Sequence, residues 1–172
     1  MGASWLQRGA PTRPRRAWLP TGGLAAYTPT MIREYPDRPF VGIGAVILRP
    51  GAALLVRRGR PPGVGRWSLP GGAQAVGETA EAAARRELLE ETGLTVGPML
   101  LPGMADSIHQ DPDGRIRFHY TILDYAARWT GGVPAAGDDV TDARFWEFDA
   151  FGALDLTADA VRIIAAARQL LP

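Results

Sequence analysis

The 172-residue sequence contains no cysteine, so the chain can form no disulfide framework, no zinc-thiolate site and no cysteine nucleophile. Any metal must therefore bind through oxygen or histidine ligands. Because a chain without cysteine suits a reducing compartment, we predict a cytoplasmic location. Lysine is absent as well, since all 19 basic residues are arginine. In a chain also rich in Ala, Gly and Pro, this bias reflects the coding genome and is weak evidence for phosphate binding.

Long hydrophobic runs are also missing, and no stretch approaches the ~20 apolar residues that cross a bilayer. We therefore predict a soluble protein with no membrane partner, whose hydrophobic fraction of 46% allows a buried core. Residues 1–30 hold four arginines and no acid, which leaves a charge of −3 on residues 31–172 once these four are removed from the net +1. This mildly acidic body gives no argument for nucleic-acid binding.

Residues 1–30 mix Arg, Pro and Gly without a hydrophobic period, so we predict a loosely ordered N-terminal extension. The pair Arg15-Arg16 precedes a short apolar run, as in twin-arginine export signals. Pro20 and the two glycines after it interrupt that run, so export is not predicted. Residues 31–172 have the size of one domain.

The strand and helix signals follow in quick succession after residue 38. Two apolar runs of strand length, Phe40–Leu48 and Ala52–Arg58, are separated by a Pro-Gly turn and predict a hairpin. Further extended segments are expected at residues 67–69, 94–104, 115–129 and 142–148. The "QDPDG" stretch before residue 115 predicts a turn, which places His109 in a loop.

Two helices are predicted between these strands. The first is capped by Thr79 and ends at Gly93, and the second spans Thr157–Leu171. In the second helix, one apolar face is expected to comprise Val161, Ile164, Ala165 and Leu171. Strands interleaved with helices indicate an α/β fold, a mixed β-sheet between helices in an α/β/α sandwich.

The first of these helices carries an unusual concentration of glutamate. Glu87, Glu90 and Glu91 share an arc of about 100° on the helix, although like charges one turn apart destabilise a helix. Carboxylates grouped in this way suit a hard divalent cation such as Mg²⁺ or Mn²⁺. The alternative is a solvated acidic face paired with Arg85 and Arg86.

The spacing around these glutamates decides between the two interpretations. Gly72, Glu78, Arg86-Glu87-Leu88, Glu90-Glu91 and Gly93-Leu94 match every specified position of Gx5Ex7REUxEExGU, where U is aliphatic. This is the signature of the Nudix hydrolases, which the chain resembles over roughly residues 38–172. The family has the α/β/α sandwich expected above and hydrolyses a nucleoside diphosphate linked to another group, using Mg²⁺ or, as a substitute, Mn²⁺.

The resemblance assigns roles to the residues of this motif. It implies that Glu87, Glu90, Glu91 and the backbone carbonyl of Gly72 are metal ligands. Glu78 and Arg86 correspond to the residues that brace the loop against the helix. The general base of the family is either a glutamate of the motif or an acid from a later loop, for which Asp139, beside Asp138, is the candidate; a plain turn is the alternative.

Three arginines near the motif, Arg57, Arg58 and Arg66, are candidates to bind substrate phosphate, with solvated strand ends as the alternative. The expected partner is a small nucleotide, and the dimers known in the family leave a homodimer open. The stretch after residue 110 resembles short bacterial ADP-ribose pyrophosphatases, so ADP-ribose or a similar nucleotide sugar is the first expectation. A MutT-like nucleoside triphosphatase and a non-catalytic nucleotide sensor are the alternatives.

Overall fold

The computed structural model describes residues 33–171, so the predicted extension at residues 1–30 lies outside the described residues. No helix within this range is long and apolar enough to cross a membrane. In chain order the elements are β1 (Phe40–Arg49), β2 (Ala52–Arg58), β3 (Trp67–Ser68), β4 (Gly71–Ala73), α1 (Ala80–Thr92), β5 (Leu100–Gln110), β6 (Ile116–Arg128), β7 (Val140–Glu147), the 3₁₀ helix η1 (Phe148–Ala153) and α2 (Ala158–Leu170).

The seven strands form one mixed sheet. Its main order is β3-β2-β1-β6-β5, with β4 paired to β1 and β7 paired to β2. Only β1 and β6 run parallel among these pairs, and β6 follows β1 in register from Phe40 opposite Tyr120 to Leu48 opposite Arg128. The predicted mixed sheet is therefore confirmed.

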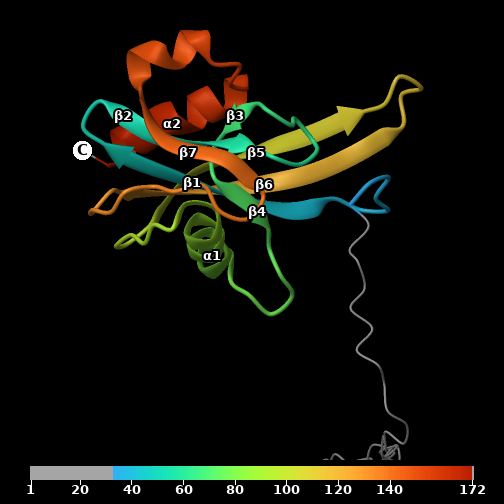
Figure 1. The fold of residues 1–172 in the computed structure, drawn as a ribbon. Coiled ribbons are helices and arrows are strands. Elements are labelled where there is room, and N and C mark those ends of the chain that lie inside the picture. Colours follow the sequence, from blue (N-terminus) through green and yellow to red (C-terminus); the bar gives the residue numbers. More distant parts are fainter. Residues whose placement is uncertain (1–32, 172) are drawn as a thin grey trace, which may run out of the picture. The chain divides into compact units, whose positions relative to one another are not determined.

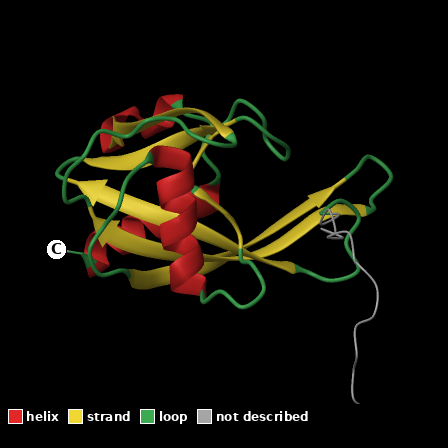
Figure 2. Ribbon diagram, turned by 60° about the horizontal axis from the view of Figure 1, so that its bottom comes forward, coloured by secondary structure: helices red, strands yellow, loops and turns green. Residues whose placement is uncertain are grey.

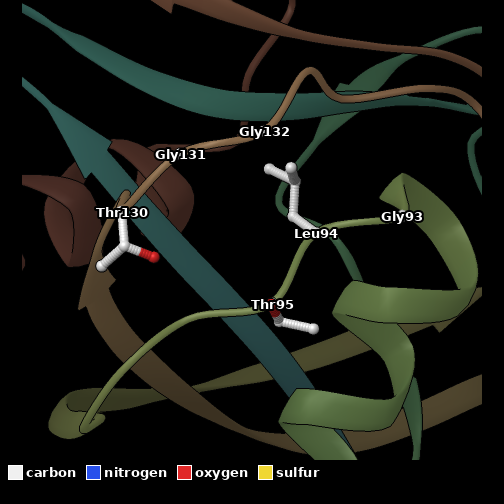
Figure 3. A pocket seen from close by; sticks show the side chains of 6 residues that line it. All are labelled: Gly93, Leu94, Thr95, Thr130, Gly131 and Gly132. Atoms are coloured by element: carbon white, nitrogen blue, oxygen red, sulfur yellow. The ribbon is translucent and has the colours of Figure 1, made fainter.

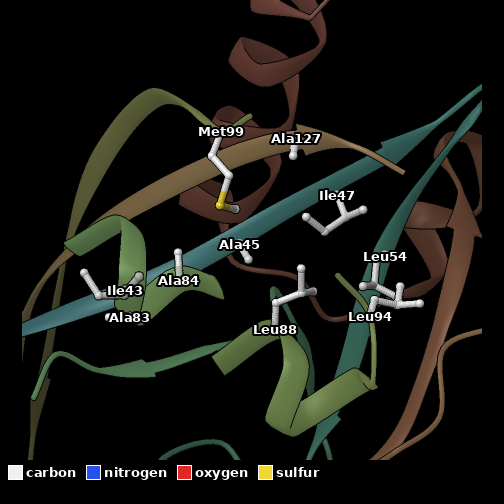
Figure 4. Packing of buried hydrophobic residues seen from close by; sticks show 10 residues of the cluster. All are labelled: Ile43, Ala45, Ile47, Leu54, Ala83, Ala84, Leu88, Leu94, Met99 and Ala127. Carbon is white, nitrogen blue, oxygen red and sulfur yellow. The ribbon is translucent and has the colours of Figure 1, made fainter. Parts of the chain in front are cut away.

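Helices cover both faces of this sheet, with α1 on one side and α2 on the other (Figures 1 and 2). The core between the sheet and α1 contains Ala83, Ala84 and Leu88, which meet Ile43, Ile47 and Leu54 of the strands (Figure 4). The core on the opposite face is built around Ile163, Ile164 and Ala167 of α2. This is the α/β/α sandwich that the sequence predicted.

The predicted hairpin of β1 and β2 forms, but its strands pair only next to the turn. The paired positions are Leu48 with Ala53 and Arg49 with Ala52. Beyond them β2 pairs with β3 and β7, whereas β1 pairs with β4 and β6. The divergence of the two strands lets β4, and the loop that follows it, reach the side of β1 next to α1.

Two local predictions were wrong. The strand expected at residues 94–104 begins only at Leu100, because Gly97-Pro98 precede it, and it continues to Gln110 because it pairs with β6 almost to the turn. His109 is therefore in a strand and not in a loop. In α2 the buried face contains Ile163, while Val161 is 44% exposed and Ala165 is also exposed.

The position of Gly103 explains the rotation of α2. A Cβ atom at Gly103 would come within 2.9 Å of Ile163 Cδ1, so the missing side chain makes room for this isoleucine on β5. The pattern of apolar residues predicted that α2 forms, whereas the space beside Gly103 on β5 determines that Ile163 lies on its buried face.

Candidate active site

The motif folds into a loop and a helix whose ends are set by local chemistry. The side chain of Thr79 accepts a hydrogen bond from Ala82 N at 3.2 Å and caps α1. Gly93 ends the helix in the left-handed conformation, with φ 69°, and its N–H donates to Leu89 O. The helix ends predicted at these two residues are confirmed, and they fix which residues occupy each turn of α1.

Glu78 and Arg86 join the loop to the helix. Nε and Nη2 of Arg86 donate to Glu78 Oε1 and Oε2 at 2.9 and 3.0 Å, a forked pair. Arg86 Nη2 also donates to Ala73 O at 3.2 Å, and Glu78 Oε2 accepts from Ala75 N at 3.1 Å. The bonds from Arg86 lower the pKa of Glu78. This geometry fits the bracing role expected of both residues.

The same guanidinium holds two of the three grouped carboxylates. Arg86 Nη1 donates to Glu87 Oε1 at 2.8 Å and to Glu90 Oε2 at 2.9 Å. The third carboxylate is held by backbone instead, because Glu91 Oε2 accepts from Gly71 N at 2.9 Å. Among the described residues, no hydrogen bond reaches the second oxygen of any of these three glutamates.

Burial changes the proton affinity of this group. Glu91 is 7% exposed, and burial, supported by the negative charge of Glu87, raises its pKa to about 7 against the hydrogen bond from Gly71. Burial also raises the pKa of Glu87, against the hydrogen bond from Arg86. The side chain of Glu90 remains 44% exposed. A cation beside these carboxylates would favour their ionised forms.

Gly72 lies directly against Glu87. A Cβ atom at this glycine would overlap the Glu87 carboxylate, so only glycine permits this approach. The approach brings carboxylate oxygen beside backbone, and carboxylate and carbonyl oxygens are the donors that Mg²⁺ and Mn²⁺ prefer. Within residues 33–171, no group of three acidic or histidine side chains is arranged closely enough to hold a metal ion. Arg86 supplies the positive charge between Glu87 and Glu90 in this arrangement.

The structure brings Asp139 to the same side of the molecule. The loop before β7 is bonded to the last turn of α1, because Ala135 N donates to Thr92 O and Gly137 N donates to Glu91 O, at 3.0 and 3.1 Å. Asp139 lies close enough to raise the pKa of Glu91. Its neighbour Asp138 has a φ of 42°, a left-handed conformation that is uncommon for a residue with a side chain.

The three candidate phosphate-binding arginines have different partners. Side chains alternate along β2, so Arg58 lies on the α1 face with Leu54, and its charge lowers the pKa of Glu91. Arg57 lies on the other face, where it donates to Gly65 O at 2.9 Å. Arg66 pairs with Asp155 at 2.8 Å, in the segment leading to α2. Of these three arginines, Arg58 is the one whose charge acts on Glu91, and phosphate binding by the three stays a prediction.

The sequence analysis missed Arg60, beside this region, and Asp124, on the other face of the sheet. Arg60 forms an ion pair with Asp139 at 2.7 Å, and no signal separated it from the other arginines of an arginine-rich chain. Asp124 is 4% exposed in the middle of β6. A single acid inside the apolar run "TILDYAA" was a signal for a buried carboxyl, and it went unused.

A cavity of about 290 Å³ lies at the C-terminal end of α1 (Figure 3). It is lined by Gly93, Leu94, Thr95, Thr130, Gly131 and Gly132. None of the grouped carboxylates lines it. We therefore place the candidate site at the glutamates and not at this cavity.

Residues 38–167 match the model of the NUDIX domain, and the chain therefore belongs to this family. The chain is 37% identical over 111 residues to an ADP-ribose pyrophosphatase of Methanocaldococcus jannaschii, covering 64% of this chain and 63% of that one. It is 43% identical over 102 residues to an oxidized purine nucleoside triphosphate hydrolase of Danio rerio, covering 55% and 58%. The chain thus spans about three fifths of the length of these relatives.

A solved structure supports the fold independently. The NUDIX domain of Shewanella oneidensis NrtR, crystallised with ADP ribose, aligns with a TM-score of 0.66 at 22% identity, over 86% of this chain and 96% of that one. At this identity the likeness establishes the fold alone.

Proposed function

We propose that the chain is a divalent-metal-dependent pyrophosphohydrolase that cleaves a nucleoside diphosphate linked to another group. ADP-ribose or a similar nucleotide sugar is the first substrate class, supported by the similarity to an ADP-ribose pyrophosphatase. Mg²⁺ is the proposed cofactor, with Mn²⁺ as a substitute. Its proposed ligands are Glu87, Glu90, Glu91 and the backbone carbonyl of Gly72.

One observation carries this proposal. Each of the three glutamates is positioned by a hydrogen bond to one of its oxygens, from Arg86 or from Gly71 N, and keeps the other oxygen free of described partners. A solvated acidic face paired with Arg86 would leave these carboxylates in water, whereas Glu91 is buried and bonded to backbone. Carboxylates that are oriented in advance and still have free oxygens are suited to bind a metal ion.

Other residues of the chain have supporting roles in the proposed mechanism. When bound, a divalent cation lowers the pKa of its water and neutralises phosphate oxygens. Arg86 holds Glu87 and Glu90 in place, and Glu78 orients Arg86. Asp139 is proposed to accept the proton of the attacking water, whose oxygen bonds to phosphorus while the bridging P–O bond breaks toward the other phosphate.

A second substrate class has support of its own. The relative from Danio rerio, at 43% identity, is an oxidized purine nucleoside triphosphate hydrolase. A MutT-like triphosphatase is therefore the alternative activity. A non-catalytic nucleotide-binding domain is the alternative from another class, in which binding occurs without turnover.

Phosphate release from a panel of substrates tests all three. The panel contains ADP-ribose, nucleotide sugars, NADH, diadenosine polyphosphates, dNTPs and an oxidised purine triphosphate, each with Mg²⁺, Mn²⁺ or EDTA. Added phosphatase and pyrophosphatase convert the monoester and pyrophosphate products to phosphate. We expect metal-dependent turnover, greatest with ADP-ribose, and loss by orders of magnitude in Glu90→Gln.

The matched control is Glu81→Gln, the same change on the same helix, at a residue whose carboxylate pairs with Arg85 at 2.8 Å. Its turnover should equal that of the wild type. A leading rate with the triphosphate would select the alternative substrate class. Nucleotide binding without any turnover, from folded protein that binds Mn²⁺, would overturn the enzymatic proposal in favour of the sensor.

A further inference from the structure

An ion pair joins two loops beside the candidate site. Arg60, in the loop between β2 and β3, places Nη2 2.7 Å from Oδ1 of Asp139, in the loop before β7. The side chain of Arg60 is 69% exposed and that of Asp139 is 36% exposed. The guanidinium therefore lies at the surface, directly next to the acid proposed as the general base.

Backbone contacts place this pair. Gly59 N donates to Asp139 O at 2.8 Å, and Gly59 has no room for a Cβ atom, which would lie 2.6 Å from the same oxygen. Arg58 Nε donates to Pro62 O, and Gly65 N donates to Arg58 O. These bonds tie the loop that carries Arg60 to the end of β2. The two loops are thus held together without the Arg60 side chain.

The ion pair itself is poorly formed as a hydrogen bond. Oδ1 of Asp139 is buried, and no hydrogen bond of acceptable geometry reaches it despite the short distance to Arg60. A partly exposed ion pair contributes only about 0–1 kcal/mol. Arg60 therefore contributes little to the fold, and a partner with more charge can replace Asp139.

A diphosphate is such a partner. It carries more negative charge than one carboxylate, and its oxygens match the forked donors of a guanidinium. We propose that Arg60 binds the diphosphate of the substrate and leaves Asp139 when the substrate arrives. This inference rests on the proposed function, and it adds a substrate-binding residue that also controls when the base is free.

The exchange fits the chemistry of the step. Before the substrate binds, the guanidinium of Arg60 lies beside Oδ1 of Asp139, which is the oxygen that would accept the proton of water. After Arg60 moves to the diphosphate, Asp139 accepts that proton as the water oxygen bonds to phosphorus and the bridging P–O bond breaks. The leaving phosphate takes the electron pair of the broken bond, so charge and atoms balance.

Steady-state kinetics with the substrate that the panel identifies test the proposal. We expect Arg60→Ala to raise KM about tenfold or more and to change kcat less than about threefold, because Asp139 is already free in this variant. Arg60→Lys keeps the positive charge but lacks the paired N–H donors of the guanidinium, so it should raise KM only a few-fold. Asp139→Asn should instead lower kcat, by about 10²- to 10⁴-fold, with little change in KM.

The matched control is Arg49→Ala, which removes another surface arginine paired with an acid, Glu147, at 3.0 Å. It should leave both constants unchanged. An unchanged KM in Arg60→Ala, or a fall in kcat alone, would overturn the role of Arg60, and thermal melts of each variant detect a folding defect. A wild type without turnover on any substrate would instead refute the proposed function, so the two failures are distinct.

Discussion

Two buried carboxylates, those of Glu91 in α1 and Asp124 in β6, lie on opposite faces of the sheet. Both contact the same row of paired strand residues. In this row Asp124 of β6 pairs with Gly44 of β1, and Gly44 pairs with Gly71 of β4. Glu91 accepts from Gly71 N on the α1 face. The carboxylate of Asp124 lies against Gly44 on the α2 face, where a Cβ atom would overlap it. Burial raises the pKa of each acid to about 7.

The surroundings of these two acids differ. Glu91 has a hydrogen bond from backbone, two more glutamates on its helix, and the charges of Arg58 and Asp139 nearby. The carboxylate of Asp124 has no hydrogen bond among the described residues, and the charges that act on it are those of Arg162 and Asp159 of α2. A raised pKa therefore reports burial on both faces. What distinguishes the candidate site is the gathering of several oriented oxygen donors.

The largest effect should separate the two acids by activity. Glu91→Gln should lower metal-dependent turnover by at least about 10²-fold, since it removes a proposed ligand. Asp124→Asn, the same chemical change on the opposite face, should keep turnover within about threefold. Initial rates at saturating Mg²⁺ measure both. Equal losses in the two variants would mean that the two faces act together.

The next effect concerns the contact between Asp124 and the sheet. Gly44→Ala should destabilise the fold by about 1–3 kcal/mol, because a Cβ atom would overlap Asp124 Oδ1. Gly97→Ala is the control, since no atom lies within 4 Å of its added Cβ. Urea denaturation of both variants measures the difference. A shorter residue at 124, in Gly44→Ala/Asp124→Ala, should recover part of the loss.

The third effect is a pH dependence of stability. The folded state holds the proton of Asp124 up to a pKa of about 7, whereas the unfolded chain loses it near 3.8. The unfolded state therefore binds fewer protons between about pH 4 and 7, and the free energy of unfolding falls as pH rises through this range. Asp124→Asn removes this contribution, so the variant should gain stability relative to wild type from pH 5 to pH 8.

Denaturation in EDTA at the two pH values gives this double difference, in which the contribution of Glu91 cancels. Arg162 and Asp159 are the charged groups of α2 that face Asp124, and both remain in the variant. A constant difference between wild type and variant across this range would contradict the assignment of the raised pKa to Asp124.

The smallest effect compares the helix caps of the two faces. Thr79 and Thr157 cap α1 and α2 with the same geometry, accepting from Ala82 N and Ala160 N at 3.2 and 3.1 Å. Each Thr→Ala change should cost about 1 kcal/mol of stability. We expect Thr79→Ala to lower turnover as well, because α1 carries the glutamates, and Thr157→Ala to leave it unchanged. Melting curves and initial rates together check this.

Local chemistry made much of the molecule predictable. Thr79 and Gly93 set the two ends of α1 through local hydrogen bonds, and the resemblance of the motif implied the contact between Glu78 and Arg86. The two continuous apolar runs and the Pro-Gly turn between them predicted strands β1 and β2. These features depend on neighbours in sequence, which a sequence displays directly.

Features that depend on distant partners were not predictable. The buried face of α2 depends on Gly103, about sixty positions away, and the ion pair of Arg66 depends on Asp155, in the segment before α2. The ion pair of Arg60 and Asp139 joins two loops that no local pattern connects. In each case a tertiary contact selected one arrangement among several that the sequence permits.

The backbone bonds from Ala135 and Gly137 to the last turn of α1 have a consequence for hydrogen exchange. Amides in an exposed loop ordinarily exchange with solvent quickly, whereas a hydrogen-bonded amide exchanges only when its bond opens. The amide hydrogens of these two loop residues should therefore exchange more slowly than those of loop residues without such a bond. Exchange at the rate of the α1 amides would mean that the acid on the loop and the glutamates on the helix belong to one cooperative unit.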